Sequence, residues 1–344
     1  MKTVQHSLLS IAACLLFASP HGAASPFKIA DETGWSGYVF LGANSSNISS
    51  NLIASGSSSS DDGAFIEDLT SEPDSRHNVS PAYGLDLRYT FKPGKAQAFL
   101  GTLIQDAVRL DFQQHAGIRL QTSKHASTSL SYVFSGAPRR VWEDPYLTGQ
   151  DRDDVKRQHS GVRLAWQSTH FFGPLVNYSY QTIDVDDERS GFALRDANVL
   201  SQQEVESLDR NGHAHYFSAG YRLPINRQHS LIPELNFRRW DLDGEAVSND
   251  RFGVQLTYRF SRDQHTVISN FAWGRTSYDA RNPVFNERTN GQEWLVNAQW
   301  FRKNWFGIDP LSSLIALSYG NSEADVAFND IELFSARVGA LYRF

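Results

Sequence analysis

Arginine recurs along this chain at positions where apolar and polar side chains alternate. A guanidinium group stays charged at any physiological pH and presents a planar fork that binds carboxylate or phosphate oxygens. The arginines in this pattern are Arg88, Arg119, Arg163, Arg222, Arg238, Arg259 and Arg337, and the acidic residues in comparable positions are Asp86, Glu234 and Glu293. This excess of cations predicts the recognition of anions. The scattered serines, histidines and aspartates match no nucleophile elbow, so we expect no enzymatic activity.

The elements that position these arginines are predicted to be β-strands. In residues 83–91 one face carries Tyr83, Leu85, Leu87, Tyr89 and Phe91, and the other carries Gly84, Asp86, Arg88 and Thr90. Residues 252–260 and 334–344 repeat this alternation. Because successive side chains of a strand point to opposite sides, each segment has one apolar face and one polar face. The arginines lie on the polar faces.

Over the whole chain this pattern predicts about fourteen strands, joined by alternating short and long connections. They are expected at 35–44, 82–91, 96–105, 111–122, 128–135, 160–169, 174–183, 213–223, 229–240, 251–260, 265–278, 292–303, 311–320 and 331–344. Aromatic residues gather at the strand ends, as in the girdles of membrane barrels. We therefore predict an all-β fold, a transmembrane antiparallel β-barrel with apolar faces toward lipid and arginines toward the lumen. A water-soluble sandwich is the alternative.

Composition and charge exclude other classes of protein. Of the 344 residues, 40% are hydrophobic, 12% are aromatic and 20% are charged, and the net charge is -6. A chain with few charges and many aromatic residues is ordered, and the absence of a basic cluster argues against a nucleic-acid partner. Beyond residue 25 no apolar run is long enough for a membrane-spanning helix.

The first 24 residues are predicted to be a secretory signal peptide. Lys2 precedes an apolar stretch from Leu8 to Ala18, and small residues follow at 22–24. Residues 25–344 form the predicted barrel, which is exported through the periplasm to the outer membrane. Cys14, the single cysteine, lies inside the signal segment. A lipoprotein box ending at Cys14 is the competing interpretation, but the apolar run continues past this residue.

An even number of antiparallel strands places both termini on the periplasmic side, under the short turns, and directs the long loops outward. The first loop, about 45–81, is rich in serine and acidic residues and is predicted to be mobile. Bulky apolar residues are costly on a free loop, so the third loop is predicted to pack against the inner wall, with the arginines as its partners. The residues expected to constrict the lumen are Trp142, Glu143, Asp144, Tyr146, Asp186, Asp187 and Glu188.

Two smaller features of the loops have defined expectations. Ser201 and Glu204 have the spacing of a capping box, which predicts a short helix in the fourth loop. The closely spaced aspartates of this loop suggest calcium, but they lack the spacing of a calcium-binding loop, and His213 and His215 have no third ligand nearby. We therefore expect no metal and no cofactor.

Several segments together resemble a known family. Residues 36–43, 141–149, 183–191, 208–212 and 241–246 are similar to a family of gamma-proteobacterial outer-membrane proteins that is classed as a domain of unknown function. The resemblance implies an outer-membrane barrel and supplies no activity. Separately, Tyr342 and Phe344 resemble the C-terminal assembly signal of outer-membrane proteins, which implies the barrel assembly machinery as a partner.

The function expected from these features is passive diffusion of small hydrophilic solutes, anionic ones among them, through an arginine-biased lumen. A narrow barrel lined with arginines is similar to porins for acidic oligosaccharides. The alternative is a structural or adhesive surface barrel that does not conduct, in which the arginines only pair with acidic loops. Under both hypotheses the other partners are outer-membrane lipid and lipopolysaccharide.

Overall fold

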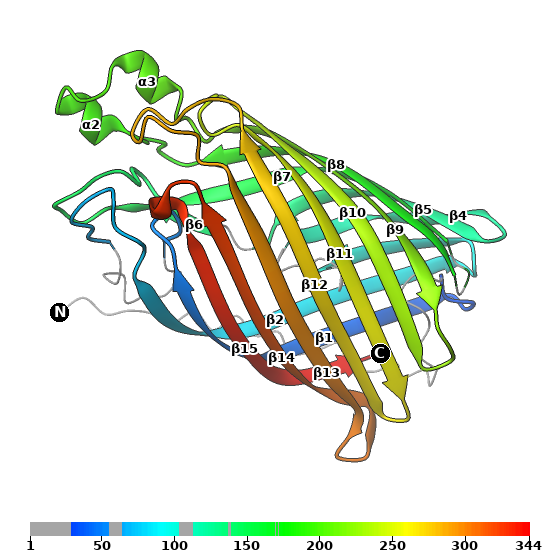
Figure 1. Cartoon of the computed structure of the whole chain (residues 1–344). Coiled ribbons are helices and arrows are strands. Elements are labelled where there is room, and N and C mark those ends of the chain that lie inside the picture. Colours follow the sequence, from blue (N-terminus) through cyan, green and yellow to red (C-terminus); the bar gives the residue numbers. More distant parts are fainter. Residues whose placement is uncertain (1–28, 55–63, 103–112, 137–138, 169, 171) are drawn as a thin grey trace, which may run out of the picture.

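The computed structural model describes residues 29–54, 64–102, 113–136, 139–168, 170 and 172–344, and within them antiparallel strands form one closed sheet (Figure 1). The strands are β1 (Gly34–Ser49), β2 (Ser75–Lys92), β3 (Ala96–Gly101), β4 (Gln113–Ser123), β5 (Ala126–Ser135), β6 (Arg139–Trp142), β7 (Asp154–Ser168), β8 (Gly173–Val185), β9 (Gly212–Pro224), β10 (His229–Leu242), β11 (Asn249–Arg262), β12 (His265–Tyr278), β13 (Gly291–Trp305), β14 (Ile308–Ala324) and β15 (Ile331–Arg343). The helical segments are α2 (Phe192–Asp196), α3 (Gln202–Glu206) and the 3₁₀ turn η1 (Ala327–Asn329).

The sheet closes because the last strand pairs with the first. β15 runs antiparallel to β1, from Tyr38 opposite Arg343 to Ser49 opposite Glu332. β5 pairs directly with β7, whereas the short β6 pairs only with the beginning of β7. The wall of the described part of the chain therefore has fourteen strands, and β6 is an addition at one rim. This confirms the predicted antiparallel barrel.

The two faces of the wall have opposite polarity. Tyr83, Leu130 and Val338 are 69%, 61% and 57% exposed, whereas Thr90, Ser218 and Ser312 are fully buried. A water-soluble protein has the reverse arrangement, because an apolar outer surface of this size would drive association in water. Apolar side chains outside and polar side chains inside are the pattern of a transmembrane barrel, so the sandwich alternative is wrong.

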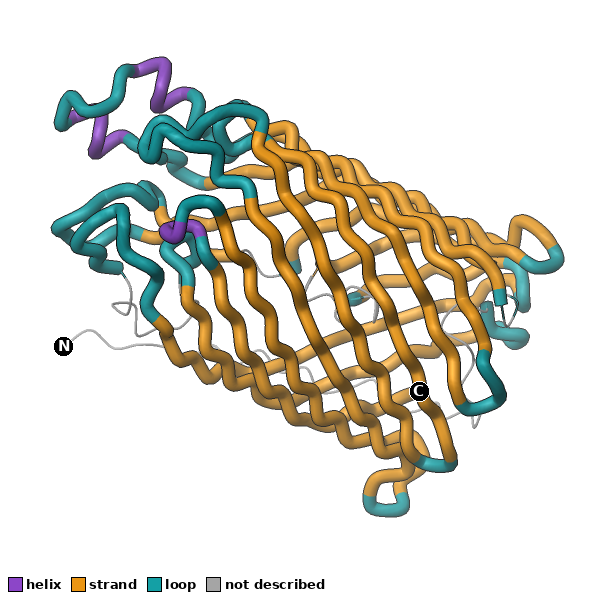
Figure 2. The backbone as a smooth tube through the Cα atoms, viewed as in Figure 1, coloured by secondary structure: helices purple, strands orange, loops and turns teal. Residues whose placement is uncertain are grey.

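Short turns connect the strands at one end, and long loops with the helices connect them at the other (Figure 2). β15 ends beside the short turns, so the C-terminus lies at that end (Figure 1). Three of these turns contain residues with positive φ: Gly94 at 63°, Asp263 at 50° and Asn304 at 51°. Gly, Asp and Asn tolerate this conformation best, which allows the chain to reverse within a few residues.

Several strands are longer than predicted at the end that carries the long loops. β7 begins at Asp154, although the prediction began at 160, and β1 continues to Ser49, although the prediction ended at 44. The outward residues of this part of β7, such as Lys156 and Gln158, are polar, so apolar alternation does not detect it. The sheet thus extends beyond its apolar band. The predicted signal peptide, 1–24, lies outside the described residues and stays a prediction.

Candidate functional site: the lumen wall and the loop cap

The predicted lumen arginines lie on the inward-facing side of their strands. On β4, Arg119 is 4% exposed, whereas its neighbours Ile118 and Leu120 are 50% and 48% exposed and face outward. Arg163 on β7 is likewise buried between the exposed Val162 and Leu164. The same alternation places Arg88, Arg222, Arg238, Arg259 and Arg337 inward, together with Asp86, Glu234 and Glu293.

One of these arginines shows how a guanidinium in this lumen holds a carboxylate. Arg88 donates from Nε to Oδ1 of Asp86 and from Nη2 to Oδ2, both at 2.6 Å. Arg119 lies nearby, with its guanidinium carbon 5.5 Å from the centroid of the Phe99 ring. Of the three predicted acidic residues, Glu293 pairs with Arg251, whose Nε lies 2.6 Å from its Oε1. Asp86 and Glu293 are thus each paired with a neighbouring arginine, and the inward-facing arginines outnumber the inward-facing carboxylates.

The lumen also has features that the sequence analysis missed. Arg157 and His159 on β7 face inward, but they precede the predicted strand at 160–169. An apolar cluster on the inner wall contains Phe40, Ala82, Phe301, Leu314, Ala316 and Leu341. The lumen wall is therefore polar over much of its surface but apolar on the β13–β14–β15–β1–β2 side. Phe40 fits there because Gly42 and Gly339 have no side chains, and a Cβ on either would come within 3 Å of its ring.

At the end of the barrel opposite the short turns, four loops share a hydrophobic core, which we call the loop cap. Its buried residues are Tyr146, Leu200, Val205, Leu208, Ala246 and Phe328. The hydroxyl of Tyr146 accepts a hydrogen bond from Asn282 at 3.0 Å, and burial raises the pKa of Tyr146 to about 12. The third loop therefore packs as predicted, but the described contacts of Tyr146 are with other loops and not with the inner wall.

Asp144 holds the third and fourth loops together. Its Oδ1 accepts hydrogen bonds from the backbone N–H of Tyr146 at 3.0 Å and of Gly191 at 2.9 Å, and its Oδ2 accepts one from Ala193 at 3.0 Å. A buried carboxylate with three N–H donors is well stabilised. The predicted helix of the fourth loop is confirmed as α3, where Ser201 and Glu204 form a capping box.

The acidic residues of these loops pair with arginines of the loops. Glu188 accepts from Nε of Arg210 at 2.7 Å, and Glu143 pairs with Arg189 at 3.0 Å. Arg210 also donates to the backbone oxygens of Trp142 and Glu143, at 2.8 and 3.0 Å. Asp186 and Asp187 lie in the tight turn that follows β8, where Asp187 has a φ of 46°. The expectation that the lumen arginines are the partners of the third loop is wrong for Glu143, which pairs with Arg189 of the fourth loop.

Arg152 holds the described parts of the first loop, and the predicted mobility of this loop stays a prediction. Arg152 is 4% exposed and donates to the backbone oxygens of Ala64 at 3.0 Å, Asn51 at 2.9 Å and Pro145 at 3.0 Å. Its guanidinium carbon lies 4.4 Å from the centroid of the Trp142 ring, and burial lowers its pKa to about 10. Arg152 remains charged at neutral pH and joins the described part of the first loop to the third. The serine run at 57–60 lies outside the described residues.

The loop after β12 is attached to β10 by a bidentate ion pair. Arg239 donates to Oδ1 of Asp279 from Nη1 at 2.8 Å and to Oδ2 from Nη2 at 2.5 Å. This arginine lowers the pKa of Asp279 below its ordinary value of 3.8. Because the pKa of Asp279 is lower in the folded loop than in the open loop, ionised Asp279 stabilises the folded loop at pH values above its ordinary pKa. This stabilisation is lost as the pH falls through the lowered pKa.

We therefore expect the segment 279–290 to open more readily as the pH falls below about 4. Hydrogen exchange of this segment, corrected for the intrinsic exchange rate at each pH, measures the effect. The Asp279→Asn variant is the control, because its loop should already be open at pH 7 and should respond little to acid. An equally steep response of both proteins would show that another group titrates.

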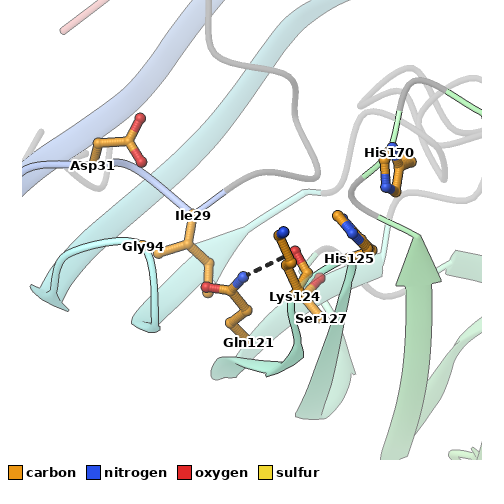
Figure 3. A pocket seen from close by; sticks show the side chains of 8 residues that line it. All are labelled: Ile29, Asp31, Gly94, Gln121, Lys124, His125, Ser127 and His170. Carbon is orange, nitrogen blue, oxygen red and sulfur yellow. Dashed lines mark hydrogen bonds between the residues drawn. The ribbon is translucent and has the colours of Figure 1, made fainter.

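The mouth of the barrel beside the short turns contains a cavity of about 270 Å³ (Figure 3). Lys124, His125 and His170 lie on one side of it, and Asp31 lies on the other. The rings of His125 and His170 are 3.8 Å apart between centroids. Burial, His170 and Lys124 lower the pKa of His125 below its ordinary value of 6.5.

Two further observations concern the described residues only. No group of three or more His, Cys, Asp or Glu side chains in them is arranged to hold a metal ion. None of their helices has the length and apolar character that crossing a membrane requires. His215, which faces outward, is hydrogen-bonded to the hydroxyl of Tyr178 at 2.9 Å.

The family described as "Protein of unknown function (DUF2860)" matches residues 34–343, which is almost the whole described barrel. No curated protein matches the chain. Similar solved structures include the outer-membrane channel DcaP of Acinetobacter baumannii, with 9% identity, coverage of 91% of this chain and 97% of that chain, and a TM-score of 0.43. A FadL homologue of Pseudomonas aeruginosa has 10% identity, coverage of 89% and 90%, and a TM-score of 0.45. OmpT, an outer-membrane protein of Vibrio cholerae, has 10% identity, coverage of 90% and 98%, and a TM-score of 0.41. At these identities the likeness concerns the fold alone.

Proposed function

Since the chain belongs to this family, whose function is unknown and whose match covers the barrel, we propose a function from the side chains that line the lumen. The protein is a passive channel of the outer membrane. Small hydrophilic solutes diffuse through it, and anions are preferred. The observation that carries the proposal is the excess of inward-facing arginines over inward-facing carboxylates. A channel wall with one sign of charge concentrates ions of the opposite sign and raises their rate of entry.

The two ends of the barrel have different roles in this proposal. The loop cap covers part of the outer rim. The third and fourth loops, which contribute to it, narrow the entrance in this proposal through Trp142, Glu143, Asp144, Tyr146, Asp186, Asp187 and Glu188. The arginines lie deeper and select by charge. The outward apolar band contacts membrane lipid and lipopolysaccharide. No step of this function needs a cofactor or a catalytic residue.

Conductance in planar lipid bilayers tests the proposal. The purified full chain is expected to form steps of current in potassium chloride, and a salt gradient is expected to give a reversal potential of the sign that chloride permeation produces. A protein that is folded, as judged by its strand content, and that never conducts would refute a channel.

The second candidate is a structural or adhesive surface barrel that does not conduct. The packing of the loop cap favours it, because a rigid surface with buried aromatic residues such as Tyr146 and Phe328 is suited to presenting a contact face. This candidate predicts no conductance and an unchanged outer surface when the lumen arginines are neutralised. The bilayer measurement therefore separates the two functions.

We also propose that the barrel assembly machinery recognises the C-terminal strand through Tyr342 and Phe344. Phe344 exchanges two backbone hydrogen bonds with Gly37, at 2.9 and 3.2 Å, and these do not depend on its side chain. The Phe344→Ala variant is thus expected to refold in detergent as the parent does, but to reach the outer membrane of cells at a level several-fold lower. Fractionated membranes and heat-modifiable migration in gels measure both. Equal levels of variant and parent in the outer membrane would contradict this role.

A further inference from the structure

A cationic and aromatic cluster lies on the inner wall near the extracellular rim, apart from Arg88 and Arg119. The guanidinium carbon of Arg157 on β7 is 4.3 Å from the centroid of the Trp240 ring on β10. Arg238 approaches the same ring at 5.7 Å and the Tyr216 ring at 6.0 Å. The imidazole of His159 lies 6.2 Å from Trp240. Side chains from β7, β9 and β10 therefore meet in the lumen.

The guanidinium of Arg157 differs from that of Arg88 in its hydrogen bonds. Among the described residues, Nε and Nη2 of Arg157 have no hydrogen-bond partner, and both atoms are buried. In Arg88 the same two atoms form the fork that holds the carboxylate of Asp86. Stacking on Trp240 covers the face of the Arg157 guanidinium. The N–H bonds lie in the plane of the group, so the stacked ring does not accept hydrogen bonds from them. A buried donor without an acceptor costs free energy, which a bound acceptor would recover.

The surroundings of Arg157 favour an anion. Arg157 interacts electrostatically with Arg210, Arg139 and Arg238, and with the carboxylate of Glu188. Glu188 already accepts a hydrogen bond from Arg210. The site therefore has a local excess of positive charge. Arg157, Tyr216, Arg238 and Trp240 are each partly exposed, so a solute in the lumen can contact the cluster, and the side chains around Nε and Nη2 of Arg157 must move to admit it to these buried donors.

We propose that Arg157, with Arg238 and Trp240, forms a binding subsite for a small carboxylate at the extracellular end of the lumen. A carboxylate has two oxygens in one plane, which can accept the two parallel hydrogen bonds that Nε and Nη2 of a guanidinium donate. Arg88 and Arg239 of this protein already bind side-chain carboxylates through two nitrogens in this way. The apolar part of the ligand packs beside Trp240. This inference rests on the proposed function, because a solute reaches the subsite through the lumen.

The test is calorimetric titration of the detergent-solubilised full chain with sodium succinate at low ionic strength. Succinamide, which has the same carbon skeleton without charge, is the control ligand. We expect saturable heat with succinate and none with succinamide. Arg157→Gln is expected to weaken succinate binding about tenfold or more, since charged hydrogen bonds are lost. Arg302→Gln, which removes the same charge from an exposed position on the outer side of β13, should bind as the parent does.

A second variant covers the case in which Arg157→Gln does not fold. Arg157→Lys keeps the charge but loses the planar fork, so it should still bind succinate several-fold more weakly than the parent. Equal affinity of the parent and the folded Arg157 variants would overturn the subsite, and so would absence of saturable heat in the parent. Each result is independent of conduction. Conduction without succinate binding would contradict only the proposed subsite, whereas succinate binding without conduction would contradict only the proposed channel.

Discussion

Replacing Arg163, Arg259 and Arg337 together by glutamine is expected to lower the permeability ratio of chloride to potassium by about three- to tenfold. These residues lie on β7, β11 and β15 and face the lumen from different sides of the wall. Their charges add to one positive potential inside a wall of low dielectric constant, so removing three of them weakens anion entry and favours cation entry. The reversal potential in a gradient of potassium chloride across a planar bilayer measures the change.

The matched control removes three positive charges outside the lumen. Arg227, Arg262 and Arg302 are exposed at or near the short turns, and their replacement by glutamine should leave the permeability ratio within about twofold, because salt screens exposed charges. An unchanged ratio in the lumen variant would mean that the arginines only stabilise the barrel. A loss of conductance in the lumen variant, with strand content intact, would also contradict electrostatic selection.

Replacing Arg152 by alanine is expected to release the first loop from the third. The substitution leaves three backbone oxygens without their donor and removes the cation from the Trp142 ring. Buried hydrogen bonds from a charged donor contribute about 1.5–3 kcal/mol each, so even partial compensation by water leaves a loss of about 3 kcal/mol. This corresponds to roughly a hundredfold increase in the population of the open loop. Limited digestion with chymotrypsin, which cleaves after residues such as Phe65 and Leu69, measures it.

Arg140→Ala is the control for this experiment, because Arg140 lies on the neighbouring β6 and forms an ion pair with Asp154 that is partly exposed to solvent. Exposed ion pairs contribute about 1 kcal/mol or less, so the rate of digestion should change only slightly. The barrel itself should stay intact in both variants. If Arg152→Ala were as resistant as the parent, the apolar contacts of Trp142 with Ala54 and Ala64 would suffice to hold the loop.

The sequence determined which residues form the wall and which way their side chains face. Alternation is a local property of a strand, so Arg119 between Ile118 and Leu120 could be assigned to the polar face without knowledge of its neighbours. The choice of lipid as the outer medium followed from the aromatic strand ends. The capping box of Ser201 and Glu204 was equally local, and α3 forms where it was predicted.

Only the tertiary structure decided the partners of the loops and the contents of the lumen. Arg152 meets Asn51, which is 101 residues earlier in the chain, and Arg157 meets Trp240 from a strand that is not its neighbour in the sheet. Such contacts depend on how the closed sheet brings distant segments together, and no periodicity encodes them. β6 and the extended part of β7 lie beyond the apolar band, where outward residues such as Lys156 and Gln158 are polar and apolar alternation gives no signal. The apolar patch around Phe40 was missed for a related reason. Its residues face the lumen, where the pattern predicts polar side chains, and Gly42 on the same strand and Gly339 on the neighbouring β15 make room for the Phe40 ring.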